Sequence, residues 1–141
     1  GHSWGTALAL EYYLKYPKGI KAIIFNSPYF STSLWKADAD TLITTLPDSI
    51  QLAIKTGEKN HDYGSPAYKN ANEVFYKNFG VRKTKLTSEL DTSTAKGNEF
   101  IYNYMWGPTE FTAAGTLINY NRVQSLKTTK VPTPYITREL E

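Results

Sequence analysis

Ser3 is the residue of this chain with the clearest capacity for chemistry. It has a glycine two positions away on each side, in the sequence GHSWG. A serine hydroxyl acts as a nucleophile when it stands on a tight strand-to-helix turn, which needs unusual backbone angles and small neighbours. We expect side chains at Gly1 and Gly5 to collide with the neighbouring strand and helix. The pattern therefore predicts a nucleophilic serine.

A nucleophilic serine needs an oxyanion hole and a general base. The backbone N–H of Trp4, at the start of a helix, is predicted to supply half of the oxyanion hole. His2 does not suit Ser3 as a base, because adjacent side chains on such a turn point apart; it is expected to pack or to adjoin the oxyanion hole. His61, in the polar segment GEKNHDYG, is expected to be solvent-exposed. The base is thus expected from neither histidine.

The elements that follow Ser3 alternate between helix and strand, which indicates an α/β fold. Residues 6–16 are apolar almost all round and predict a buried helix that ends before Pro17 and Gly19. The apolar run IKAIIFNSP is typical of a central strand in a parallel sheet. Residues 29–121 have helical spacing, and VPTPYIT returns to a strand. Within the helical part we predict helices from Pro47, Asp48 or Ser49 to Gly57, from Ser65 to Gly80, and at 87–96 and 98–106.

Composition excludes several classes of protein. The 141 residues are 40% hydrophobic and 21% charged, with a net charge of +3 and no basic run, so nucleic acid is not expected as a partner. An apolar stretch of the roughly 18 residues that a membrane span needs is lacking, so no membrane partner is expected either. The absence of cysteine fits a reducing compartment, and we expect a cytoplasmic protein without a metal or another cofactor.

Two separated segments resemble the proline iminopeptidase family of the α/β-hydrolase fold. They are GHSWGTALALEYYLKYPKGIKAIIFNSP and MWGPTEFTAAGTLINYN with the following LKTTKVPTPYIT. The resemblance implies a partial α/β-hydrolase with core residues 1–30, a helical cap at 31–121, and a return to the core at 122–141. It also implies a serine aminopeptidase that removes an N-terminal residue, typically proline, from peptides through an acyl-enzyme on Ser3.

The resemblance further implies where the substrate binds. A cap glutamate anchors the free amine in this family, and the matching position is Glu110 in GPTEF, where a carboxylate would form a charge-assisted hydrogen bond. The alternative is that Glu110 starts a helix capped by Thr109. Trp106 is a weaker candidate and, with Tyr102 and Tyr104, either lines a pocket for a proline ring or packs in the core.

The end of the chain departs from the family pattern. The family continues into a GE-x-D-E segment, whereas this chain reads TRELE, which puts Arg138 in place of a glycine and Glu141 in place of the triad aspartate. Glutamate serves as the triad acid in other enzymes of the fold, so Glu141 is a weak candidate. The family's histidine and oxyanion loop have no match here, and we expect the 141-residue chain alone to be an inactive fragment.

Two other interpretations stay open. The chain can belong to a different cap-bearing α/β-hydrolase, an esterase or an amidase. It can also be a non-catalytic helical module that binds a partner. A peptide with a free N-terminus is the expected partner in the first interpretation. The unpaired strand edges also indicate self-association or contact with the remainder of a parent enzyme.

Overall fold

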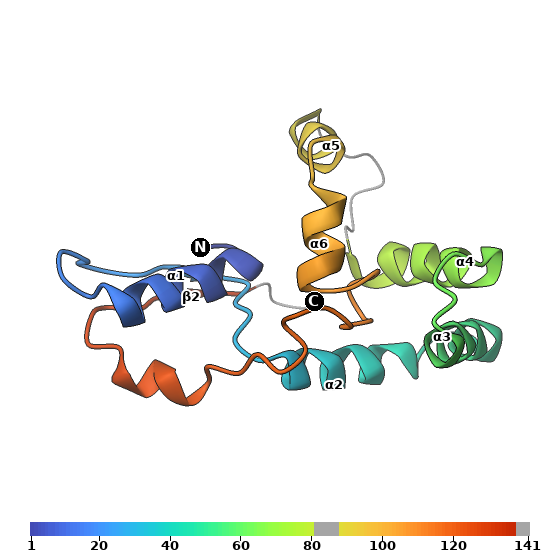
Figure 1. Ribbon diagram of the computed structural model, residues 1–141, viewed down its shortest axis with the longest axis horizontal. Coiled ribbons are helices and arrows are strands. Elements are labelled where there is room, and N and C mark those ends of the chain that lie inside the picture. Colours follow the sequence, from blue (N-terminus) through green and yellow to red (C-terminus); the bar gives the residue numbers. More distant parts are fainter. Residues whose placement is uncertain (81–87, 138–141) are drawn as a thin grey trace. The chain divides into compact units, whose positions relative to one another are not determined.

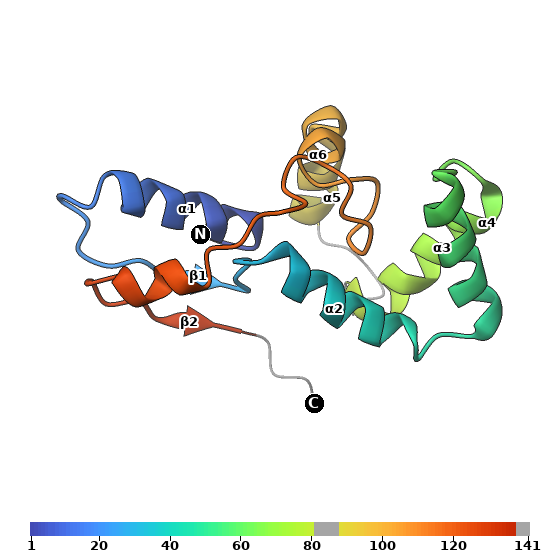
Figure 2. The ribbon, with the colours of Figure 1, turned by 60° about the horizontal axis from the view of Figure 1, so that its bottom comes forward.

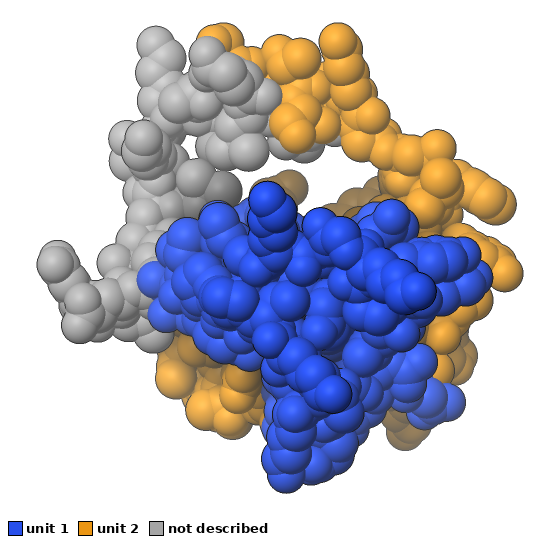
Figure 3. Space-filling model, turned by 90° about the vertical axis from the view of Figure 1, so that its left-hand side faces the viewer, with its two compact units in different colours: residues 1–35, 119–141 blue, residues 36–118 orange. Residues whose placement is uncertain are grey.

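The computed structural model describes residues 1–80 and 88–137. It divides into two compact units, residues 1–35 with 119–141 and residues 36–118, which are coloured separately in Figure 3. The second unit is inserted into the first in sequence and lies inside the predicted cap range of 31–121. Along the chain the elements are α1 Trp4–Lys15, β1 Phe25–Asn26, α2 Thr32–Ile43, α3 Asp48–Asn60, α4 Pro66–Phe75, π-helix Tyr76–Gly80, α5 Ser88–Ala95, α6 Glu99–Met105, 3₁₀-helix Gln124–Thr128 and β2 Tyr135–Ile136.

The first unit holds a short parallel sheet. β1 pairs with β2 in parallel, with Phe25 opposite Tyr135 and Asn26 opposite Ile136, and the two strands lie side by side in Figure 2. On the other edge of β1, His2 forms a parallel bridge to Asn26. β1 therefore lies between two parallel segments, as predicted for a central strand.

α1 covers this sheet with one face and leaves the other exposed. Leu10 and Tyr13 of α1 form a buried cluster with Ile23 and Phe25. The opposite side carries large apolar residues at helical spacing, and their exposed fractions are 44% at Trp4, 60% at Leu8 and 58% at Tyr12. The prediction of a buried helix is thus right for the face with Leu10 and Tyr13 and wrong for the opposite face. An apolar repeat predicts which residues can be buried, but burial also needs a neighbour on that side.

The chain leaves the first unit and returns to it at adjacent points. Ser31 forms an antiparallel bridge with Asn121. The Thr32 N–H donates to the Tyr120 carbonyl at 2.9 Å, and the Arg122 N–H donates to the Phe30 carbonyl at 2.8 Å. These bonds join the two connections to the inserted unit, one of which continues into α2. α2 was not predicted as a separate helix from the sequence.

The second unit is built on the packing of α3 against α4, which lie side by side in Figure 1. Ser65 accepts a hydrogen bond from the Tyr68 N–H and caps α4, as predicted. Gly57 does not end α3, because the helix continues to Asn60 and His61 caps it in the left-handed conformation. A Cβ at Gly57 would lie 2.4 Å from Cδ2 of the buried Tyr68 ring. Gly57 is therefore the point where the two helices approach closely.

Candidate active site

Ser3 stands on a strained turn between a strand segment and α1. Its φ of 49° and ψ of −127° lie in a region that residues with a Cβ rarely adopt. The Ser3 N–H donates to the Asn26 carbonyl at 3.0 Å, and the Asn26 N–H donates to the Gly1 carbonyl at 2.9 Å. These two bonds hold the turn on the edge of β1. The local geometry is therefore a parallel strand segment, a strained serine and a helix, in that order.

The two glycines beside Ser3 differ in what their surroundings require. A Cβ at Gly1 would lie 2.2 Å from the Gly5 carbonyl oxygen, so the turn excludes a side chain there. At Gly5 a Cβ would meet no described atom within 4 Å. The predicted collision is thus right for Gly1 and wrong for Gly5.

Trp4 has an N–H group that fits the predicted oxyanion donor. Trp4 is the first residue of α1, so its N–H has no acceptor within the helix. The next two N–H groups are engaged, because Gly5 donates to the His2 carbonyl at 2.8 Å and Thr6 donates to the Ser3 carbonyl at 2.8 Å. The role of Trp4 stays a prediction.

The two histidines lie in different units of the described structure, and His2 forms no hydrogen bond with the Ser3 hydroxyl there. His2 is exposed on the turn and bridges Asn26 through its backbone. His61 belongs to the inserted unit, and its Nδ1 lies 3.1 Å from the Tyr63 hydroxyl. His61 adopts a φ of 52°, which was not predicted, and ends α3.

Glu110 lies on a tightly held loop between α6 and the return to the first unit. Thr109 and Thr112, on either side of it, form an antiparallel bridge. Their hydroxyls lie 3.2 Å and 2.7 Å from the buried phenol oxygen of Tyr68, and the Thr112 hydroxyl donates to Glu58 Oε1 at 2.7 Å. No helix starts at Glu110 in this described loop, so the alternative of a helix-start carboxylate capped by Thr109 is wrong.

Two tyrosines hold the Glu110 carboxylate. The Tyr102 hydroxyl donates to Glu110 Oε1 at 2.9 Å, and Tyr76 also hydrogen-bonds to Glu110. Burial and then the Glu110 charge raise the pKa of both phenols above the ordinary range, so they stay neutral donors. Sequence reasoning missed Tyr76, because nothing in its spacing relates it to a residue 34 positions away. The Glu110 carboxylate is thus held by two neutral phenols.

The family comparison decides the fold. The sequence profile described as the alpha/beta hydrolase fold matches residues 1–106, which include the strained turn, α1 and β1. The chain belongs to the α/β-hydrolase fold family. This assignment fits the parallel pairing of β1 and β2, with most of the helices in the inserted unit.

Curated relatives within the α/β-hydrolases carry one recurring name. The chain is 40% identical over 136 residues to a proline iminopeptidase of Heyndrickxia coagulans, and 38% identical over 133 residues to one of Lactobacillus delbrueckii subsp. lactis. These matches cover 96% and 94% of the chain but 47% and 45% of the relatives. The chain therefore spans about half the length of the curated relatives it matches.

Solved structures show the same α/β-hydrolase arrangement. The proline iminopeptidase of Mycobacterium smegmatis superposes with a TM-score of 0.79 at 26% identity, over 96% of this chain and 46% of that one. VinJ superposes with a TM-score of 0.85 at 23% identity, over 96% of this chain and 46% of that one. This match shows a likeness of fold alone.

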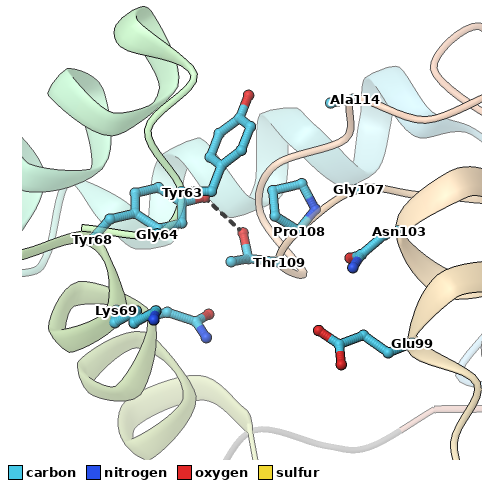
Figure 4. Close-up of a pocket in the computed structure, with 11 residues that line it drawn as sticks. Tyr63, Gly64, Tyr68, Lys69, Glu99, Asn103, Gly107, Pro108, Thr109 and Ala114 are labelled. Carbon is cyan, nitrogen blue, oxygen red and sulfur yellow. Dashed lines mark hydrogen bonds between the residues drawn. The ribbon is translucent and has the colours of Figure 1, made fainter. Parts of the chain in front are cut away.

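Trp106, the weaker substrate-binding candidate, is buried in the inserted unit of this α/β-hydrolase. Its side chain is 8% exposed, and its indole N–H donates to the Thr109 carbonyl at 2.8 Å. A hollow of about 600 Å³ lies nearby, with Lys69 on one wall and Glu99 and Asn103 on the other (Figure 4). Trp106 does not line this hollow, and its bond to Thr109 stabilises the loop that carries Glu110.

Three further predictions concern the triad acid, a metal site and a membrane span. Glu141, the candidate triad acid, and Arg138 lie outside the described residues. Among the described residues, no group of three or more His, Cys, Asp or Glu side chains could hold a metal ion. None of the helices in the described ranges has the length and hydropathy that crossing a membrane demands.

Proposed function

We propose that Ser3 is the nucleophile of a proline iminopeptidase-type serine hydrolase and that Glu110 anchors the free amine of the substrate. The single observation that carries the proposal is the backbone of Ser3, held at positive φ between a parallel strand segment and a helix. Strain of this kind costs about 1–3 kcal/mol and persists where the surrounding structure overdetermines it, as at a nucleophile. The names of the relatives support the substrate class.

In the proposed reaction, Ser3 Oγ attacks the carbonyl carbon of the first residue of the peptide while its proton passes to a general base. The Trp4 N–H donates to the developing oxyanion. The remaining peptide leaves as an amine and takes the proton, which gives an acyl-enzyme on Ser3. Water then hydrolyses this ester and releases the free amino acid.

Glu110 supplies selectivity for a free N-terminus. A carboxylate accepts several hydrogen bonds at once, and an ammonium or prolyl iminium group is a charge-assisted donor to it. An N-acetylated peptide has no such cation and would forgo this charge-assisted bond, which disfavours binding. The enzyme is thus an aminopeptidase.

The base is the part of the machinery that the described residues do not supply. We propose that a histidine from outside residues 1–141 completes the site. A triad without its base loses on the order of 10⁴ to 10⁶ in rate, so the 141-residue chain alone is expected to be inactive on proline arylamides. Cytoplasmic location belongs to the same proposal.

The test uses a chimaeric enzyme in which residues 1–141 replace the matching segment of the Heyndrickxia coagulans proline iminopeptidase. Ser3→Ala should abolish hydrolysis of proline 4-nitroanilide and labelling by a fluorophosphonate probe. Glu110→Gln should raise KM, whereas Glu99→Gln, another carboxylate of the inserted unit, serves as the matched control. A folded chimaera that hydrolyses esters and is indifferent to Glu110→Gln would favour a different cap-bearing hydrolase. Activity that survives Ser3→Ala would refute the proposal.

A further inference from the structure

Thr6 occupies an unusual position beneath the strained turn. It lies in the first turn of α1 and is fully buried, with an exposed fraction of 0%. Its Oγ1 donates to the Ser3 carbonyl oxygen at 2.6 Å and accepts from the Tyr29 N–H at 2.8 Å. The Thr6 N–H donates to the same Ser3 carbonyl at 2.8 Å. One residue therefore places two donors on the carbonyl of the proposed nucleophile.

The Ser3 carbonyl and the Trp4 N–H belong to one peptide group. That group is planar, and its C=O and N–H point in opposite directions. Fixing the carbonyl oxygen therefore fixes the direction in which the Trp4 N–H points. Donation to the carbonyl also polarises the peptide and makes its N–H a stronger donor. Thr6 thus controls both the direction and the strength of the predicted oxyanion donor.

The Thr6 hydroxyl is also bonded to the segment that follows β1. A threonine in the first turn of a helix often bonds only to its own turn. Here the Thr6 hydroxyl oxygen also accepts a hydrogen bond from the N–H of Tyr29, which lies just after β1. That loop is fixed to β2, because the Ser27 N–H donates to the Ile136 carbonyl at 2.7 Å. Hydrogen bonds at Ser27 and Tyr29, joined by the short chain between them, therefore connect β2 with the Ser3–Trp4 peptide through Thr6.

We propose that Thr6 is a positioning residue that aims the Trp4 N–H at the oxyanion of the transition state. This inference rests on the proposed function of Ser3, but it assigns a task to a residue that touches neither substrate nor base. Its effect is confined to interactions that form only in the transition state. Loss of the Thr6 hydroxyl therefore lowers kcat without changing KM.

The test compares Thr6→Val, which keeps the shape and removes the hydroxyl, with Thr6→Ser, which keeps the hydroxyl, in the same chimaeric enzyme. Thr6→Val should lower kcat on proline 4-nitroanilide by about ten- to a hundredfold, less than the loss of an entire oxyanion donor. The inhibition constant of a prolyl boronic acid, whose tetrahedral adduct needs the same N–H, should rise by the same factor. Thr6→Ser should restore most of both.

Several outcomes overturn the inference. A Thr6→Val enzyme with unchanged kcat overturns it. A Thr6→Val enzyme that loses kcat while its affinity for the boronate stays constant also overturns it, because the loss would then arise outside the oxyanion donor. If Thr6→Val does not fold, Thr6→Ala against Thr6→Ser makes the same comparison, with melting temperatures recorded for each. Activity that survives Ser3→Ala overturns the proposed function as well, whereas a Ser3-dependent enzyme that is indifferent to Thr6 overturns this inference alone.

Discussion

Tyr102 in α6 and Glu110 in the loop after it are eight residues apart, and the phenol of the first donates to the carboxylate of the second at 2.9 Å. The bond crosses from a helix to a loop and fixes one oxygen of the carboxylate. Tyr102→Phe removes this donor while keeping the ring. In the chimaeric enzyme we expect kcat/KM for proline 4-nitroanilide to fall about three- to tenfold, mainly through KM, which is the usual worth of one hydrogen bond. Tyr104→Phe, on the same helix and 61% exposed, should have no effect, and equal losses in the two variants would contradict the assignment.

The raised pKa values of Tyr102 and Tyr76 make the folded state sensitive to alkali. In the unfolded chain these phenols ionise near their ordinary value of 10.0, whereas burial and Glu110 keep them neutral in the folded state. Above pH 10 the unfolded state therefore releases protons that the folded state retains, and unfolding becomes favourable. We expect the urea midpoint to be constant between about pH 7 and 9 and to fall beyond about pH 10. Tyr102→Phe should flatten this fall, and a fall of the same size in the variant would count against it.

Gly1 and Gly5 provide a matched pair for the turn. A Cβ at Gly1 meets the Gly5 carbonyl oxygen at 2.2 Å, whereas one at Gly5 meets nothing described. Gly1→Ala should lower the free energy of unfolding of the 141-residue chain by about 1–3 kcal/mol, as overpacking does. Gly5→Ala should raise it by about 0.5–1 kcal/mol, because alanine favours the helix. Urea unfolding of both variants measures the difference, and equal losses would show that the turn does not discriminate between the two positions.

Gly57 provides a corresponding test in the inserted unit. Gly57→Ala gains about 1 kcal/mol of helix propensity but places a Cβ 2.4 Å from the Tyr68 ring. That ring is 1% exposed and bonded to Thr109 and Thr112, so it cannot move away without disturbing the Glu110 loop. We expect a net loss of about 1–2 kcal/mol of stability, since overpacking outweighs propensity. Gly64→Ala, where a Cβ meets no described atom within 4 Å, is the control and should be neutral. A stabilised Gly57→Ala variant would refute the close approach.

The sequence predicted the features that depend on neighbouring residues. The turn at Ser3, the cap at Ser65 and the order of helix and strand follow from local backbone preferences. The sequence did not predict the features that depend on contacts between residues far apart in the chain. Gly57 is typical of a helix end, yet its role comes from Tyr68 on another helix. The bonds from Tyr68 to Thr109 and Thr112 join residues 41 and 44 positions apart, and no periodicity indicates such pairs. The exposure of Trp4, Leu8 and Tyr12 on α1 was not predicted, because an apolar pattern does not show whether another element packs against that face.

Because Ser31 and Asn121 are bridged, the inserted unit, residues 36–118, begins and ends next to one place in the first unit. The two connections meet there in antiparallel register, at the spacing that a short hairpin also closes. A different insertion can therefore begin and end at this junction while the turn that carries Ser3 stays the same. Under the proposed function, evolution can alter which substrate the inserted unit selects while conserving the reaction at Ser3.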